Sequence, residues 1–325
     1  MLRWKHPLHR VKFEIYRRAC GVKDESQTDS EMFQRLSDLV HTNPYHGKHR
    51  LLGFDKNYRL DGTVNLDKTE FHVPNEYVFS LADKHPDVFL PTISVHPYRT
   101  DALSELDRWN SRGARIVKWL PNAMGIDPSN SKCDPFYQKL KQLGMILLSH
   151  GGEEKAVESE EDQKLGNPLL LRRALDHGVK VIIAHCAGLG MNQDLDDPAK
   201  RKIHNFELFL RLMDQPRYDG LVFGETSAMT QFNRLGNPLT TILQREDLHS
   251  RLVNGSDYPL PAINFLILTR PLVKGGYITS DERILLKEIY RANPLLFDFV
   301  LKRCLRAPGT NKGLPDRVFH AHPDL

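Results

Sequence analysis

The chain has 325 residues and a formal net charge of +4, with 40% hydrophobic and 26% charged residues. This composition is typical of a soluble globular protein, and so mild a charge argues against nucleic-acid binding. The apolar runs fall far short of the roughly 20 residues that a membrane span needs, and the charged N-terminal stretch does not resemble a secretory signal. Four cysteines (Cys20, Cys133, Cys186 and Cys304) form no C-x-x-C pair, which favours a reducing, cytoplasmic location.

Helix-like stretches come first, and strands alternating with helices follow. Residues 12–20 and 30–43 have helical periodicity, and Ser30 is the expected N-cap of the second stretch. The buried strands are expected at 51–55, 88–95, 115–120, 145–150, 179–185, 221–226 and 251–257, and the helices between them at 75–86, 104–113, 135–144, 167–178, 205–215 and 237–247. Several helices end at glycine (Gly113, Gly144, Gly178), the expected C-terminal stop. Strict alternation predicts a parallel α/β architecture.

Four polar residues end separate apolar runs: Lys118, His150, His185 and Asp257. They follow one another at intervals of one or two units of roughly 30 residues, the length of a strand with its crossover helix in an eight-fold βα barrel. Such barrels carry their active sites at the carboxyl ends of the strands, so we expect these side chains at one mouth. Only seven strands are found, which predicts a (β/α)8 TIM-type barrel lacking its first strand. The expected division is an irregular helical segment (1–48), the barrel (49–306) and a C-terminal tail (307–325).

His, Asp and a modifiable Lys are the groups that a divalent metal needs. A buried Lys near a metal can react with CO₂ to give a carbamate that supplies two oxygen ligands. Simpler alternatives stay open for each residue. A buried His is more often a hydrogen-bonded core residue, Lys118 could pair with Glu225 or Asp257, and Asp257 could belong to an Asx turn.

The stretches SVHPYR, VKWLPNAMGIDP, LLSHGGE, IIAHCAG and NGSDYPL, in this order, resemble the amidohydrolase superfamily, in particular its amidohydrolase-related (amidohydrolase 2) group. The resemblance implies that His150 is a metal ligand and Asp257 a ligand or base. It makes His185 a second-metal ligand or a catalytic base, and it places Lys118 where some members carry a carboxylated lysine. The implied cofactor is a divalent metal, with zinc as one or two ions the expected choice.

The function expected from this resemblance is metal-dependent hydrolysis of a C–N or C–O bond in a small molecule, such as an amide, ester or lactone, by metal-activated water. Asp257 and His185 would be the catalytic residues. One alternative is a non-oxidative decarboxylase on the same barrel, and another is an inactive barrel that acts as a binding protein. The expected partner is a small-molecule substrate, with neither nucleic acid nor membrane, and homo-oligomer formation is left open.

Further residues are candidates for supporting roles. His96 and Arg99 end the 88–95 run and are candidates for substrate binding, Arg99 as a clamp for a carboxylate or as a loop anchor. Glu153 and Glu154 are expected in the first turn of a helix after His150. Glu225 would support a ligand rather than bind metal itself, and Cys186 is interpreted as a small buried residue.

One part of the family pattern is missing. The family opens with His-x-His at the end of its first strand, and no such pair precedes residue 51. The missing strand and the missing ligands coincide, so we expect the natural start to lie upstream of Met1. The alternative is a genuine product that binds metal poorly or is inactive.

Overall fold

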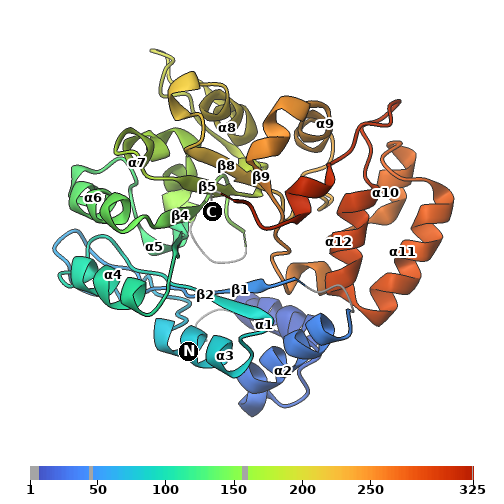
Figure 1. Ribbon diagram of the computed structural model, residues 1–325, viewed down its shortest axis with the longest axis horizontal. Coiled ribbons are helices and arrows are strands. Elements are labelled where there is room, and N and C mark those ends of the chain that lie inside the picture. Colours follow the sequence, from blue (N-terminus) through green and yellow to red (C-terminus); the bar gives the residue numbers. More distant parts are fainter. Residues whose placement is uncertain (1–6, 44–46, 156–159, 324) are drawn as a thin grey trace. The chain divides into compact units, whose positions relative to one another are not determined.

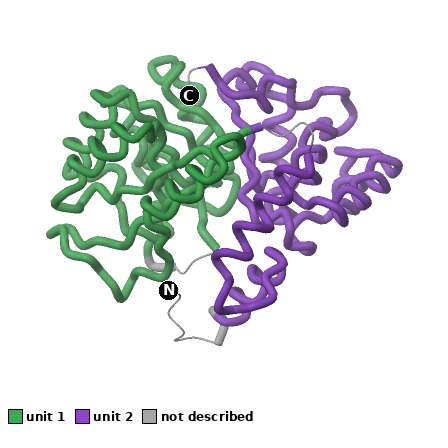
Figure 2. The backbone as a smooth tube through the Cα atoms, turned by 60° about the horizontal axis from the view of Figure 1, so that its bottom comes forward, with its two compact units in different colours: residues 1–2, 48–225, 325 green, residues 3–47, 226–324 purple. Residues whose placement is uncertain are grey.

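The computed structural model describes residues 7–43, 47–155, 160–323 and 325. The chain forms two compact units, shown in two colours in Figure 2. Unit 1 comprises residues 1–2, 48–225 and 325, and unit 2 comprises residues 3–47 and 226–324. The three-part division expected from the sequence stays a prediction.

Unit 1 is built on parallel strands that alternate with helices. The parallel pairs are β1 with β2, β3 with β4, β4 with β5, and β5 with β8. An isolated parallel bridge joins Ile93, the residue after β2, to Val117 in β3. The strands are β1 (His49–Leu52), β2 (Phe89–Thr92), β3 (Ile116–Trp119), β4 (Ile146–His150), β5 (Val181–Ala184), β6 (Met191–Gln193), β7 (Lys202–His204) and β8 (Val222–Glu225). The helices are α3 (Asn75–Lys84), α4 (Ala102–Ser111), α5 (Pro121–Met124), α6 (Asp134–Leu143), α7 (Arg172–Asp176) and α8 (Asn205–Met213).

The predicted α/β class of TIM-barrel type is confirmed, with α4, α6, α7 and α8 on the outer side of the strands (Figure 1). The strands that the structure describes do not close into a barrel. Strands β3, β5 and β8 are buried along their whole length, as expected for strands covered on both faces. The expectation of a buried strand at 51–55 is wrong in detail. Strand β1 spans His49–Leu52, and its side chains alternate between half-buried and exposed.

The C-terminal ends of the helices were predicted better than their N-terminal ends. Gly113, Gly144 and Gly178 have positive φ angles of 98°, 63° and 73°, which suits residues without a side chain. The prediction of Ser30 as an N-cap is wrong, because α2 (Thr28–His41) already begins two residues earlier and the Ser30 hydroxyl donates to the Gln27 carbonyl. The antiparallel hairpin β6–β7 was not predicted from the sequence.

Unit 2 is mainly helical. It contains α1 (Pro7–Ala19), α2, α9 (Asn237–Gln244), the short strand β9 (Leu252–Val253), α10 (Thr269–Lys274), α11 (Ser280–Ala292) and α12 (Pro294–Cys304). Helix α11 starts with a capping box between Thr279 and Glu282, in which each side chain satisfies the other's backbone N–H. The two helix-like stretches predicted at the start of the chain are confirmed as helices, since they correspond to α1 and α2.

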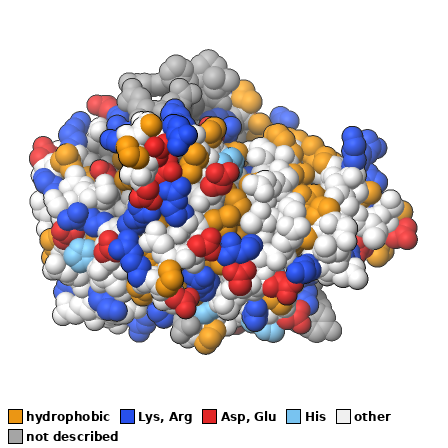
Figure 3. Space-filling model, turned by 90° about the horizontal axis from the view of Figure 1, so that it is seen from above, with side chains coloured by type: hydrophobic (Ala, Val, Ile, Leu, Met, Phe, Trp, Pro, Cys, Tyr) orange, Lys and Arg blue, Asp and Glu red, His pale blue; other side chains and the backbone are white. Residues whose placement is uncertain are grey.

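The surface mixes charges of both signs. On the face shown in Figure 3, Lys and Arg side chains are interspersed with Asp and Glu. Within the described ranges, every helix is too short or too polar to span a lipid bilayer.

Candidate active site

Two histidines lie side by side at the carboxyl ends of neighbouring strands in unit 1. His150 ends β4 and is in register with Ala184, the last residue of β5, which His185 follows directly. The ring centroids of His150 and His185 are 5.2 Å apart, with the rings inclined at 66°. Both side chains are buried, with residue exposures of 3% and 7%. Parallel strand pairing thus brings together two residues that are far apart in the sequence.

A carboxylate faces the Nδ1 atom of each ring. Glu154 Oε2 lies 3.5 Å from His150 Nδ1, and Glu225 Oε2 lies 3.7 Å from His185 Nδ1. A carboxylate on that side favours the tautomer that carries its proton on Nδ1, so that Nε2 keeps a lone pair for a ligand. Glu225 Oε2 also accepts a hydrogen bond of 3.2 Å from the His185 backbone N–H. The arrangement matches metal-binding histidines that are oriented by a carboxylate behind the ring.

The backbone that carries His185 is strained. His185, Cys186 and Ala187 have φ angles of 56°, 48° and 49°, the left-handed region that L residues rarely adopt in succession. Each such residue costs roughly 1–2 kcal/mol. Cys186 is fully buried, and burial raises the pKa of its thiol, which fits the expected packing role. Strain of this kind is concentrated at functional sites, and here it turns the chain sharply at the end of β5.

Lys118 lies on the same face of the sheet as His150. It is in register with Leu148 on β4, two residues before His150, and side chains two apart on a strand share a face. The residue is 9% exposed, so it is largely buried. Its carboxylation stays a prediction.

The sequence did not predict how Glu154 is held. The expectation of a helical turn at Glu153 and Glu154 is wrong, because residues 151–155 form an irregular segment. Gln163 clamps this segment through two hydrogen bonds to the Glu154 backbone, 2.9 Å to its N–H and 2.7 Å to its carbonyl. Asn122, from α5, donates to Gln163 Oε1 and to the Gly152 carbonyl. Only the three-dimensional structure shows this network, because its members come from three separate segments: helix α5, the irregular segment after β4 and the 3-10 helix Glu160–Gly166.

His96 and Arg99 belong to a second cluster, around Asp55. Asp55 Oδ2 accepts hydrogen bonds from the His96 N–H at 2.9 Å and from Arg99 Nη1 at 3.0 Å. Arg99 Nε and Nη2 form a bidentate ion pair with the Asp101 carboxylate. The His96 ring is fully buried, with Nε2 bonded to the Met124 carbonyl and Nδ1 to the Tyr98 N–H. These contacts support the loop-anchor alternative for Arg99, and substrate binding by either residue stays a prediction.

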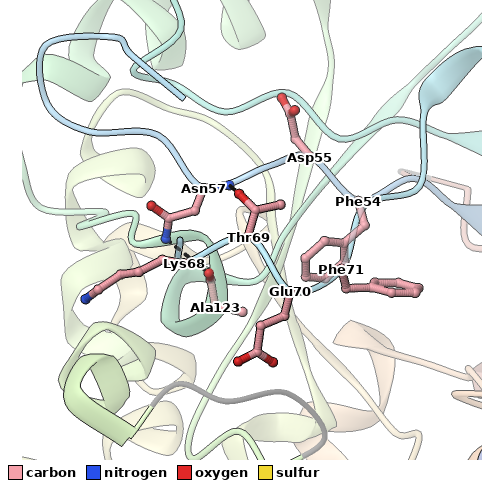
Figure 4. Close-up of a pocket in the computed structure, with 8 residues that line it drawn as sticks. All are labelled: Phe54, Asp55, Asn57, Lys68, Thr69, Glu70, Phe71 and Ala123. Atoms are coloured by element: carbon pink, nitrogen blue, oxygen red, sulfur yellow. Dashed lines mark hydrogen bonds between the residues drawn. The ribbon is translucent and has the colours of Figure 1, made fainter. Parts of the chain in front are cut away.

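A small pocket lies beside this cluster (Figure 4). It is lined by Phe54, Asp55, Asn57, Lys68, Thr69, Glu70, Phe71 and Ala123. The Asn57 N–H donates to Thr69 Oγ1, and the Asn57 side-chain amide donates to the Ala123 carbonyl, so the long loop after β1 is tied to α5. The pocket is therefore a feature of the loop packing near Asp55.

Asp257 belongs to unit 2, where it follows β9. The residue is half-buried and has a φ angle of 54°, and its carbonyl accepts a hydrogen bond of 2.9 Å from the Leu260 N–H. Asp tolerates the left-handed region better than most residues. The convergence of Asp257 with the two histidines stays a prediction from the sequence.

The two histidines suit a borderline divalent metal such as zinc. Both are buried, both have a carboxylate behind Nδ1, and neutral imidazole nitrogen is a preferred zinc ligand. Among the residues that the structure describes, no group of three or more His, Cys, Asp or Glu side chains is arranged to hold a metal ion. The pair therefore fits part of the ligand set of a divalent metal.

Gly152 is a sensitive position in the loop after His150. Its φ angle is 90°, and a Cβ atom there would lie 2.7 Å from the Leu189 carbonyl oxygen. We expect Gly152→Ala to destabilise the protein by about 2 kcal/mol or more, from backbone strain and the clash together. Gly113 is the matched control, because its φ is 98° but nothing lies within 4 Å of an added Cβ. Urea unfolding of both variants tests this, and an equal loss in the two would contradict the clash.

Parallel strands alternating with helices, with polar residues at the strand ends, define an α/β protein of the TIM-barrel type. The chain belongs to the amidohydrolase family, whose model matches residues 55–262, and the predicted relationship is thus confirmed. The solved structure of an uncharacterized TIM-barrel protein from Bordetella bronchiseptica is similar in fold, with a TM-score of 0.54 at 15% identity over 79% of this chain and 81% of that one. A putative 2-pyrone-4,6-dicarboxylic acid hydrolase from Pseudomonas putida is similar over 72% of this chain and 74% of its own, at 17% identity and a TM-score of 0.41. No curated protein matches the chain.

Proposed function

We propose that this protein is a metal-dependent hydrolase that cleaves a C–N or C–O bond in a small molecule, such as an amide, ester or lactone. The observation that carries the proposal is the pair of buried histidines at adjacent strand ends, each with a carboxylate facing Nδ1. Membership of the amidohydrolase family supports the same reaction class.

In this proposal His150 and His185 would hold a divalent metal, with zinc expected, through their Nε2 atoms. Glu154 and Glu225 orient the two rings and keep the protons on Nδ1. A divalent metal, when bound, lowers the pKa of a coordinated water and polarises the bond to be cleaved. Asp257 accepts the proton of the attacking water on its carboxylate and returns it to the leaving group. Lys118 is a further candidate ligand after carboxylation.

Zinc affinity tests the roles of the two carboxylates. Glu154→Gln and Glu225→Gln each keep the shape of the side chain but remove its charge, and we expect each to weaken zinc binding about 10- to 100-fold. His150→Asn and His185→Asn should weaken it further. Competition with a chromophoric chelator gives the affinities. Glu207→Gln, at an exposed position on α8, is the matched control and should bind zinc as the wild type does.

Turnover tests the reaction itself. The zinc-loaded protein is assayed against a panel of esters, lactones and amides, and against aromatic carboxylic acids with detection of CO₂. Hydrolysis that disappears in His185→Asn would support the proposal. Release of CO₂ without hydrolysis would assign the decarboxylase alternative, and an absence of zinc binding together with an absence of turnover would favour the inactive barrel.

A further inference from the structure

A buried ion pair lies in unit 2, on α12. Lys302 and Asp298 are one helical turn apart, and Lys302 Nζ lies 2.6 Å from Asp298 Oδ2. Each residue is only 1% exposed. Removing two charges from water is costly, and well-packed apolar residues of similar volume often stabilise a fold equally well or better. Stability alone is therefore a weak explanation for this pair.

The Lys302 ammonium has a second contact that points to another role. Its Nζ donates a hydrogen bond of 2.5 Å to the Gly255 carbonyl oxygen. Gly255 lies two residues before Asp257, in the segment that leaves β9. The preceding residue is also fixed, since the Asn254 N–H donates a 3.0 Å bond to the Val318 carbonyl. Two consecutive residues ahead of Asp257, Asn254 through its N–H and Gly255 through its carbonyl, are thus tied to other parts of unit 2.

Hydrogen bonds at the N-terminus of α12 fix the helix that carries Lys302. Asn293 caps the helix by accepting a 2.9 Å hydrogen bond from the Leu296 N–H. The amide of the same side chain donates at 2.7 Å to the Leu39 carbonyl near the end of α2. Asp298 then holds the lysine from one turn earlier on the same helix. The ammonium group therefore has a defined position from which to hold Gly255.

We propose that Lys302 is a positioning residue: oriented by Asp298, it fixes the Gly255 carbonyl and thereby the backbone that places the Asp257 carboxylate. Asp257 needs such support, because its own φ of 54° lies in a sparsely populated region from which an unsupported chain would relax. The catalytic consequence of this inference rests on the proposed function, whereas the restraint on the backbone does not.

Two variants separate positioning from stability. Lys302→Met keeps the length of the side chain but leaves Asp298 buried without the ammonium. The double variant Asp298→Leu/Lys302→Met removes both charges and retains an apolar core, so its denaturation midpoint should stay close to that of the wild type. Lys287→Met, at an exposed position on α11, is the matched control.

Hydrogen exchange measured by mass spectrometry reads out the restraint directly. We expect amides in residues 253–260 to exchange about tenfold faster or more in the folded double variant than in the wild type, because a hydrogen bond to a charged group is lost. The control should exchange as the wild type does. Wild-type exchange rates in the folded double variant would overturn the proposal.

Kinetics on a substrate found in the panel give the catalytic consequence. The double variant should lower kcat about tenfold or more with little change in KM, and should shift the pH profile of kcat, since the proton acceptor is displaced while binding persists. If Asp257→Asn is fully active while the double variant still exchanges faster, the restraint stands and the proposed role of Asp257 fails. An unchanged kcat and pH profile in the double variant, with Asp257→Asn inactive, would overturn the positioning role alone.

Discussion

Replacing Asp257 by Asn is expected to lower turnover by about 10²- to 10⁴-fold while the fold persists, as for the loss of a general base. Asn has the shape of Asp but cannot accept a proton at pH 7. It also tolerates the left-handed backbone region, so the φ of 54° at this position adds no new strain. The chemical change is therefore separated from a structural one. The measurement is kcat on the best substrate of the panel, with the denaturation midpoint of the variant beside it.

Asp281→Asn is the control for this prediction, because it makes the same chemical change at an exposed position on α11. Its turnover should equal that of the wild type. Full activity in Asp257→Asn would remove this carboxylate from the mechanism, and the base would then have to be sought elsewhere, with His185 as the next candidate.

The strand ends were the most predictable part of this protein. His150 and His185 each follow a continuous apolar run, and parallel strands place their carboxyl ends along one edge. The 5.2 Å separation of the two rings follows from that simple rule. Glu225 ends the next strand in the sheet order, and its Oε2 lies 3.7 Å from His185 Nδ1, but its role as a support for a ligand stays a prediction. The periodicity of the strands and their parallel register were sufficient to predict that these two strand ends are neighbours.

The loops were not predictable in the same way. Glu154 follows His150 closely, and the local sequence predicts a helical start, yet two hydrogen bonds between the Glu154 backbone and the Gln163 side chain hold the segment in an irregular conformation. The hairpin β6–β7 lies within the long connection after β5, where tertiary contacts and not periodicity decide the structure. The positive φ angles at 185–187 likewise have no signature in the residues themselves, since none of the three is Gly, Asn or Asp.

His96 shows why a candidate residue in a site cannot be judged from its type. The sequence places a His at a strand end, which is equally compatible with a ligand and with a core residue. In the structure both ring nitrogens are used within the fold: Nε2 donates to the Met124 carbonyl and Nδ1 accepts from the Tyr98 N–H. A second proton would have to enter on Nδ1, where it would face that N–H. The ring is therefore held neutral.

This neutral ring should make the protein sensitive to mild acid. Burial, with a smaller contribution from the nearby Arg99 guanidinium, lowers the pKa of His96 from 6.5 to about 3. Between these two values the unfolded chain binds a proton at this position and the folded chain does not. The resulting stability is fully present above pH 6.5 and is lost as the pH falls toward 3. We expect His96 to contribute a slope of up to about 1.4 kcal/mol per pH unit in that window.

Urea unfolding of the wild type and of His96→Gln between pH 7 and pH 4 isolates this contribution. The carboxylates titrate in both proteins, so the difference between the two slopes belongs to His96. His96→Gln should be less stable at pH 7, because the ring's packing and hydrogen bonds are altered, but it should lose less stability on acidification. His320→Gln, at an exposed position, should keep the wild-type slope. Parallel slopes for the wild type and His96→Gln would mean that the ring accepts a proton in the folded state, and the hydrogen bond from the Tyr98 N–H to Nδ1 would then have to open in mild acid.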